Sequence, residues 1–122
     1  MNERLQNNLM ICDTDIDSAL RRLGGNESLY ISCLGKFIKD PTMQQLCDAV
    51  LNENWNEAFT AAHALKGVAG NLGFIPLYHA IGELVILIRS GKVKDIDLSM
   101  QQVRRCYDDI MFALNDNSND KG

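Results

Sequence analysis

Apolar residues recur every three or four positions along most of this 122-residue chain, a spacing typical of amphipathic α-helices. In the last long segment they alternate steps of four and three without a fault, at Ile96, Met100, Val103, Tyr107, Ile110 and Leu114. The same spacing predicts four earlier helices, over about 27–39, 41–53, 55–72 and 76–90. Two weaker patterns predict short helices near the N-terminus, within 1–12 and 16–23.

Residue types at the ends of these segments support the helical interpretation. Asn54 and Glu57 fit a capping box at the start of one helix, and Gly73 supplies its stop. Asp40-Pro41 interrupts the pattern, so that residues 27–53 form either one bent helix or two. No segment carries a convincing strand pattern. The sequence therefore predicts an all-α fold, an antiparallel four-helix bundle with one or two short N-terminal helices.

The composition, with 46% apolar and 23% charged residues, is that of one ordinary globular domain. We expect this domain to span residues 1–114 and a polar, disordered tail to follow over 115–122. A net charge of −4 without a lysine or arginine cluster argues against nucleic acid as a partner. No stretch approaches the roughly 20 apolar residues of a membrane span, so no direct membrane contact is expected.

The cysteines are four in number and far apart, at Cys12, Cys33, Cys47 and Cys106. They form no C-x-x-C pair, and three of them lie on or beside apolar stripes. We therefore expect buried free thiols in a reducing cytosol, and hence a cytoplasmic location. The chain could equally be a domain of a longer, membrane-anchored sensor protein.

The segment 55–72 carries an unusual outer face. Its apolar stripe consists of Ala58, Ala62, Leu65, Ala69 and Leu72. His63, Lys66, Gly67 and Gly70 follow at i, i+3, i+4 and i+7, so they share a different face. An exposed imidazole is partly neutral near pH 7, and its Nε2 can attack a phosphoryl group to form a phosphoramidate. Lys66, one turn on, can interact with the phosphoryl oxygens.

The two glycines on this face need an explanation of their own. Each costs about 1 kcal/mol relative to alanine in a helix interior. Clearance for an approaching partner would explain both Gly67 and Gly70. Close packing of another segment against them is the alternative.

Two motifs in this segment, Ala62-His63-Ala64-Leu65-Lys66-Gly67 and Ala69-Gly70-Asn71-Leu72-Gly73, are similar to the signature of histidine-containing phosphotransfer (HPt) domains of two-component phosphorelays. The resemblance covers about residues 15–114. It implies that His63 is the phosphoacceptor, that Lys66 supports the phosphoryl group and that Gly67 admits the partner. It further implies docking to a receiver domain, of a response regulator or a hybrid histidine kinase, which supplies the phosphorylated aspartate and Mg²⁺.

Partner docking is expected at four residues of the segment, namely Phe59, Gly67, Gly70 and Asn71. Phe59, one turn before His63, could equally pack into the bundle. One position departs from the family's pattern, because Val85 stands where Glu or Gln often follows Leu84. The group that orients His63 is therefore open, with Glu83 as one candidate.

These features predict a phosphorelay intermediate that receives a phosphoryl group from one receiver aspartate and passes it to another. We expect a phosphoryl carrier without its own nucleotide site, cofactor or metal, since His63 and His79 lack the spacing of a metal pair. One alternative is the phosphoacceptor domain of a chemotaxis-type kinase, phosphorylated by a separate ATP-binding domain. Another is a structural or adaptor bundle in which the histidine is incidental.

Overall fold

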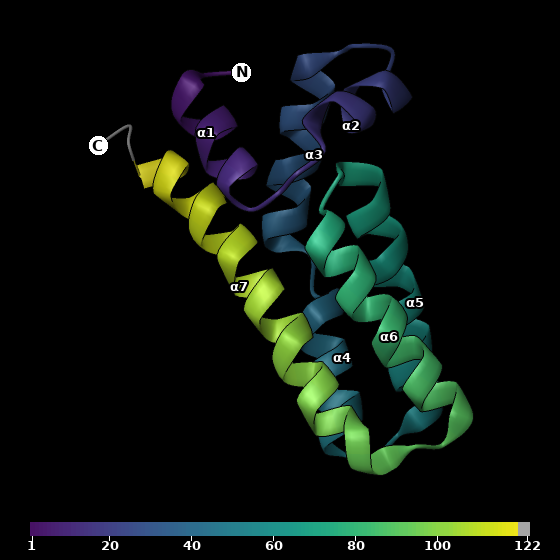
Figure 1. Cartoon of the computed structure of the whole chain (residues 1–122). Coiled ribbons are helices and arrows are strands. Elements are labelled where there is room, and N and C mark those ends of the chain that lie inside the picture. The colour runs from purple at the N-terminus through teal and green to yellow at the C-terminus, as the bar shows by residue number, and fades with distance from the viewer. Residues whose placement is uncertain (120–122) are drawn as a thin grey trace.

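Helices make up nearly all of the structure, a computed structural model that describes the backbone of residues 1–119 and the side chains of residues 1–115 (Figure 1). The elements in this range are α1 (Glu3–Ile11), α2 (Ile16–Arg22), α3 (Glu27–Lys39), α4 (Thr42–Leu51), α5 (Trp55–Leu72), α6 (Ile75–Ser90), the short 3-10 helix η1 (Val93–Asp95) and α7 (Ile96–Asn119). The described residues form no strand beyond one isolated bridge between Thr14 and Phe74. The all-α fold expected from the sequence is confirmed.

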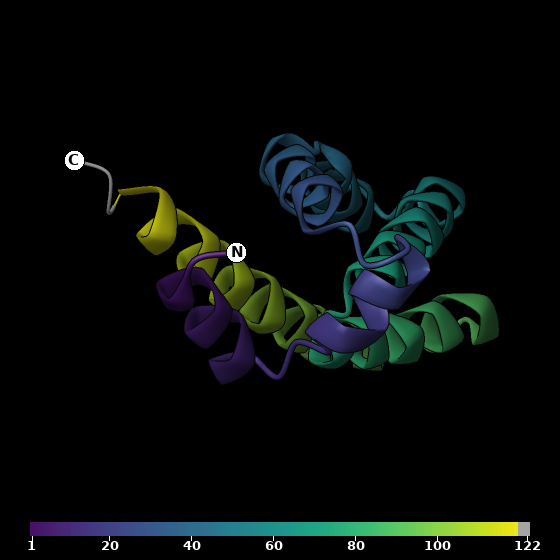
Figure 2. The same ribbon diagram turned by 90° about the horizontal axis from the view of Figure 1, so that it is seen from above.

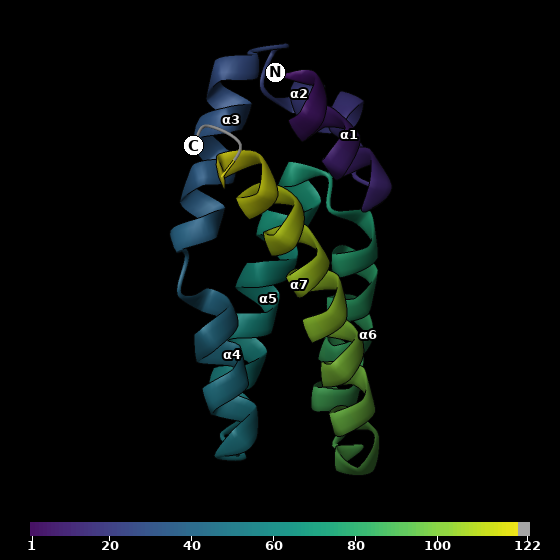
Figure 3. The ribbon, with the colours of Figure 1, turned by 90° about the vertical axis from the view of Figure 1, so that its left-hand side faces the viewer.

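The long helices form a four-column bundle. α5 packs between α4 and α6, and α6 packs against α7. α3 and α4 follow one another along a single column, as Figures 1 and 3 both show. The view from above in Figure 2 shows α1 lying against α7, outside these columns. The bundle with short N-terminal helices is therefore the observed architecture.

The junction between α3 and α4 answers the question of one helix or two. Asp40 ends α3 with an extended backbone, at ψ 125°. Its side chain accepts a hydrogen bond from the backbone N–H of Thr42 at 2.9 Å, across the intervening Pro41. Two separate helices result, because the residue before a proline disfavours the helical conformation.

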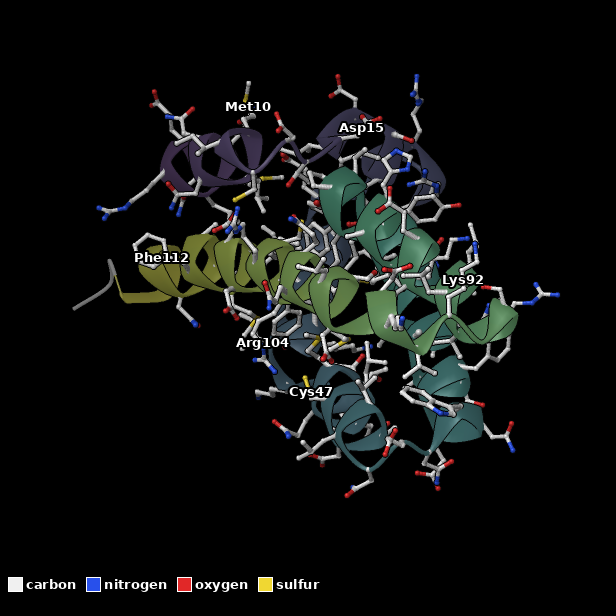
Figure 4. The ribbon with its side chains drawn as sticks, turned by 60° about the horizontal axis from the view of Figure 1, so that its bottom comes forward. Met10, Asp15, Cys47, Lys92, Arg104 and Phe112 are labelled. Atoms are coloured by element: carbon white, nitrogen blue, oxygen red, sulfur yellow. The ribbon has the colours of Figure 1, made fainter. Side chains whose placement is uncertain are left out.

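Side-chain contacts between distant segments hold the columns together. Arg104 of α7 points toward α4, where its Nη2 donates to the sulfur of Cys47 at 2.8 Å (Figure 4). The ring of Phe37 lies 5.0 Å from that of Phe74 and 5.5 Å from that of Tyr107, centroid to centroid. The core of the bundle thus joins α3 to the start of α6 and to α7.

Two expectations about chain segments need adjustment. The four cysteines are free, as expected, but their side chains are half-buried rather than buried. The helical backbone of α7 continues to Asn119, past residue 115, where the polar tail was expected to begin. Each residue added to an existing helix gains a hydrogen bond without a new nucleation cost, which lets α7 run into a polar segment. The rest of the expected tail, 120–122, lies outside the described residues.

None of the helices between residues 1 and 119 combines the length and the apolar character that crossing a bilayer requires.

Candidate functional site

α5 carries the candidate residues, and its two ends are capped. At the start, the Asn54 side chain accepts a hydrogen bond from the backbone N–H of Glu57 at 3.3 Å. At the end, Gly73 adopts the left-handed conformation, with φ +81°. The sequence-based bounds of this helix are confirmed at both ends.

Two side chains from the N-terminal helices bind the last carbonyl groups of α5. The hydroxyl of Tyr30 in α3, fully buried, donates to the carbonyl of Leu72 at 2.9 Å. Arg22 at the end of α2 donates to the carbonyl of Asn71 at 3.2 Å. These carbonyls lie in the last turn, where no helical N–H is available to them. Burial raises the pKa of the Tyr30 hydroxyl, so the group stays protonated and remains a donor.

A tight backbone contact fixes the point where α5 ends. The backbone N–H of Asp15 donates to the carbonyl of Gly73 at 2.8 Å. A Cβ placed on Gly73 would lie 2.9 Å from the carbonyl carbon of Asp15, far inside normal contact. Only glycine fits this approach of two backbones. The N-terminal segment and the site-bearing helix are therefore locked together here.

The outer face of α5 is open around His63. The His63 side chain is exposed, and the exposed residues beside it on the same face are small or polar: Thr60, Ala64, Gly67 and Asn71. A Cβ on Gly67 would meet no atom within 4 Å, apart from its own helix. A macromolecular partner can therefore reach the imidazole across a surface of small or polar side chains.

The two glycines have different surroundings. Gly67 is free of contacts, which is what clearance requires. A Cβ on Gly70 would lie 3.2 Å from two ring carbons of Tyr78, which packs on this glycine from α6. Close packing, the alternative weighed for both glycines, therefore explains Gly70 and not Gly67.

Lys66 leans toward α6. Its Nζ lies 5.2 Å from the centroid of the Tyr78 ring, within the range of a cation–π interaction. A Cβ on Gly82 would lie 3.8 Å from the same Nζ, so the lysine stem crosses a bare position of α6. The ammonium is thus held beside α6, one helical turn beyond His63.

The imidazole of His63 is stacked rather than hydrogen-bonded. The ring of Phe59, half-buried and packed against the core, lies 5.9 Å from it at an interplanar angle of 11°. Within the part of the chain that the structure describes, no side chain forms a hydrogen bond with His63. Val85 is buried and apolar. Glu83 is exposed, and within the described residues it forms no hydrogen bond or ion pair with His63. Neither side chain therefore orients the imidazole through a hydrogen bond in this structure.

Sequence reasoning missed Arg89 of α6. Its guanidinium carbon lies 5.9 Å from the centroid of the Phe59 ring. Arg89 follows Gly82 by seven residues, which places it on the same side of α6. That spacing was the available signal, but the register of α6 against α5 was needed to use it.

His79, the second histidine, is exposed on α6, with its ring 5.6 Å from that of Tyr78. Among the side chains of residues 1–115, no three histidine, cysteine, aspartate or glutamate residues gather as a metal site would require. The site on α5 therefore presents an imidazole, an ammonium group and an open surface.

Comparison with known proteins bears on this site directly. The family model described as the Hpt domain matches residues 40–111, more than half of the chain. The matched segment runs from the α3–α4 junction into α7 and includes His63 and Lys66. Comparisons with curated proteins and with solved structures give no match.

Proposed function

The chain belongs to the Hpt domain family, and from this we propose that His63 accepts a phosphoryl group from a receiver-domain aspartate and passes it to another receiver. Membership of the family by itself implies a histidine phosphotransfer role in a phosphorelay. The observation that supports transfer between two receivers is the exposed imidazole among small or polar side chains, with Lys66 one turn away and Gly67 free of contacts.

The proposed step is a displacement at phosphorus. The lone pair of His63 Nε2 attacks the phosphorus of an aspartyl phosphate, and the P–O bond to the aspartate breaks as the N–P bond forms. The electron pair of that P–O bond leaves on the aspartate carboxylate. The proton on Nδ1 can then pass to solvent, because the ring is exposed. Transfer to the second receiver is the same step in reverse.

Lys66 supports the phosphoryl group in this proposal. Phosphoryl transfer depends mainly on positioning and on neutralising charge on the phosphoryl oxygens. The ammonium of Lys66 supplies one positive charge, and the acidic pocket of the receiver with its Mg²⁺ supplies the rest. The chain itself acts as a phosphocarrier and needs no nucleotide site.

The receiver would dock over the outer face of α5. Gly67 and Asn71 are exposed there, and Phe59 borders the face beside His63. Gly70 would contribute indirectly, since it lets the Tyr78 ring lie close to α5.

We also propose a cytoplasmic location, because all four cysteines are free thiols and a reducing compartment preserves them.

The test uses radiolabelled receiver domains, loaded from labelled acetyl phosphate and mixed with the purified chain. We expect the label to move to this chain as a bond that is stable in alkali and labile in acid, as a phosphoramidate is. His63→Gln should abolish the transfer. His79→Gln is the matched control, because it removes the other exposed histidine, and it should transfer like wild type. Label retained by His63→Gln, or no transfer from any receiver of a panel, would contradict the proposal.

A further inference from the structure

The plane of the His63 ring has no hydrogen bond to fix it. The χ2 torsion of histidine has broad minima, so the rotamer alone leaves the direction of the ring nitrogens loosely defined. Within the described residues, no side chain forms a hydrogen bond with the imidazole. A nucleophile whose lone pair must point at phosphorus needs some other restraint.

The register of α6 against α5 explains why a hydrogen bond is missing. Gly82 of α6 lies beside Lys66, and Arg89 lies over Phe59. Val85 lies three residues after Gly82 and four before Arg89, so these two contacts place it between them, near the level of His63. Its side chain is apolar and only 8% exposed, so it offers the imidazole no donor or acceptor.

A stack of side chains stands in the place of that hydrogen bond. Phe59 and His63 are four residues apart on α5, a spacing that brings side chains together on a helix. Their rings lie 5.9 Å apart and nearly parallel, within the range of offset stacking. Core packing restrains Phe59 from below, and Arg89, with its Cζ 5.9 Å from the ring centroid, restrains it from α6.

We infer that Phe59 and Arg89 are positioning residues, which set the plane of the His63 imidazole through a cation–aromatic–imidazole stack. This inference rests on the proposed role of His63 as phosphoacceptor. A stack uses only the face of the imidazole, so both ring nitrogens stay open to a phosphoryl donor and to solvent. Arg89 acts through Phe59, and it comes from a helix that contributes none of the signature residues.

The stack also gives Phe59 a role that differs from docking. A docking residue affects how tightly the receiver binds, whereas a positioning residue affects the rate once the receiver is bound. Loss of an aromatic stack should reduce the transfer rate constant about twofold to tenfold. Loss of an exposed cation–π contact should reduce it about twofold to fivefold.

The kinetic test measures single-turnover transfer from a phosphorylated receiver over a range of receiver concentrations. Phe59→Leu and Arg89→Gln should lower the rate constant at saturation and leave the half-saturating concentration unchanged. Phe59→Tyr and Arg89→Lys keep a ring and a cation, and they should restore most of the rate. Arg105→Gln, which removes an exposed arginine on α7, is the matched control and should behave like wild type.

A spectroscopic arm does not depend on phosphorylation. Nuclear Overhauser contacts between the ring protons of Phe59 and His63 should be present in the wild-type chain, weaker in Arg89→Gln and intact in Arg105→Gln. Absence of these contacts in wild type would overturn the inference. A raised half-saturating concentration with an unchanged rate constant in Phe59→Leu would overturn it as well, because Phe59 would then be a docking residue. Failure of the proposed function reads differently: the ring contacts would persist, but no label would reach His63.

Discussion

Replacing Gly67 by alanine should stabilise the bundle and at the same time slow phosphoryl transfer. Gly67 lies inside α5, four residues after His63, and its side is exposed. A Cβ there would meet no atom within 4 Å, apart from its own helix. Nothing in the described part of the chain therefore opposes the substitution, and any loss of transfer must come from the partner.

The size of each effect follows from this geometry. Alanine is favoured over glycine in a helix interior by about 0.8–1 kcal/mol, so the free energy of unfolding should rise by about that amount. For a domain of this length the melting temperature should rise by about 3–5 °C. A methyl group forced into a close interface costs about 1–3 kcal/mol. The half-saturating receiver concentration should therefore rise about fivefold or more.

The assay pairs urea unfolding, followed by circular dichroism, with the single-turnover transfer described above. Gly35→Ala is the control, because Gly35 lies inside α3, is exposed and has no atom within 4 Å of a built Cβ. It should gain similar stability without any change in transfer. Gly67→Leu, with a larger side chain, should transfer more slowly than Gly67→Ala. Wild-type transfer by both Gly67 variants would refute clearance, and a less stable Gly67→Ala would refute the open surroundings.

Three further predictions concern Gly73, Tyr30 and Lys66. Gly73→Ala should lower the free energy of unfolding in urea by about 3 kcal/mol, because of left-handed strain and contact with the backbone of Asp15. Gly91→Ala, at φ +71° in open space, should lower it by only about 1–2 kcal/mol. Equal losses in the two variants would contradict the contact with Asp15. Tyr30→Phe should cost about 1–2 kcal/mol at neutral pH. Burial raises the pKa of Tyr30 above its ordinary 10.0. Above about pH 10 the tyrosine ionises first in the unfolded state, so the wild-type chain should lose further stability there. Tyr30→Phe should lose less stability over the same range in alkaline unfolding titrations. Lys66→Met should slow single-turnover transfer about tenfold and Lys66→Arg less, and an unchanged rate in Lys66→Met would exclude Lys66 from phosphoryl support.

The helix that carries the site could be delimited from the sequence because its end signals are local. Asn54 hydrogen-bonds three residues ahead, and Gly73 adopts a conformation that its own backbone permits. Such signals need no knowledge of the tertiary fold. The outer face with His63 and Lys66 followed from the helical period alone.

The contacts that could not be predicted from the sequence depend on the register between helices. The period placed Gly67 and Gly70 on one face, but only the position of Tyr78 on α6 shows that Gly70 is a packing position. Arg89 is 26 residues from His63 in the chain, and its contact with Phe59 exists only because α6 runs antiparallel to α5. Apolar periodicity says which face is inside, not which residues meet across two helices.

The end of α7 was missed for a different reason. The polar residues after Leu114 have weak helix propensity, and their composition suggested a tail from residue 115. The helix that precedes them is long and already nucleated, so its backbone continues to Asn119. The composition of a polar segment alone does not show whether a helix formed before it will extend into it.

The most direct test of the central claim is to locate the phosphoryl group on the protein by nuclear magnetic resonance. The wild-type chain, labelled with ¹⁵N in histidine, would be mixed with a phosphorylated receiver and its imidazole nitrogens observed. We expect one histidine, His63, to change at Nε2, and the change to disappear when an unphosphorylated receiver is added. Modification of His79, or a phosphorylated His63 that no receiver discharges, would contradict the account.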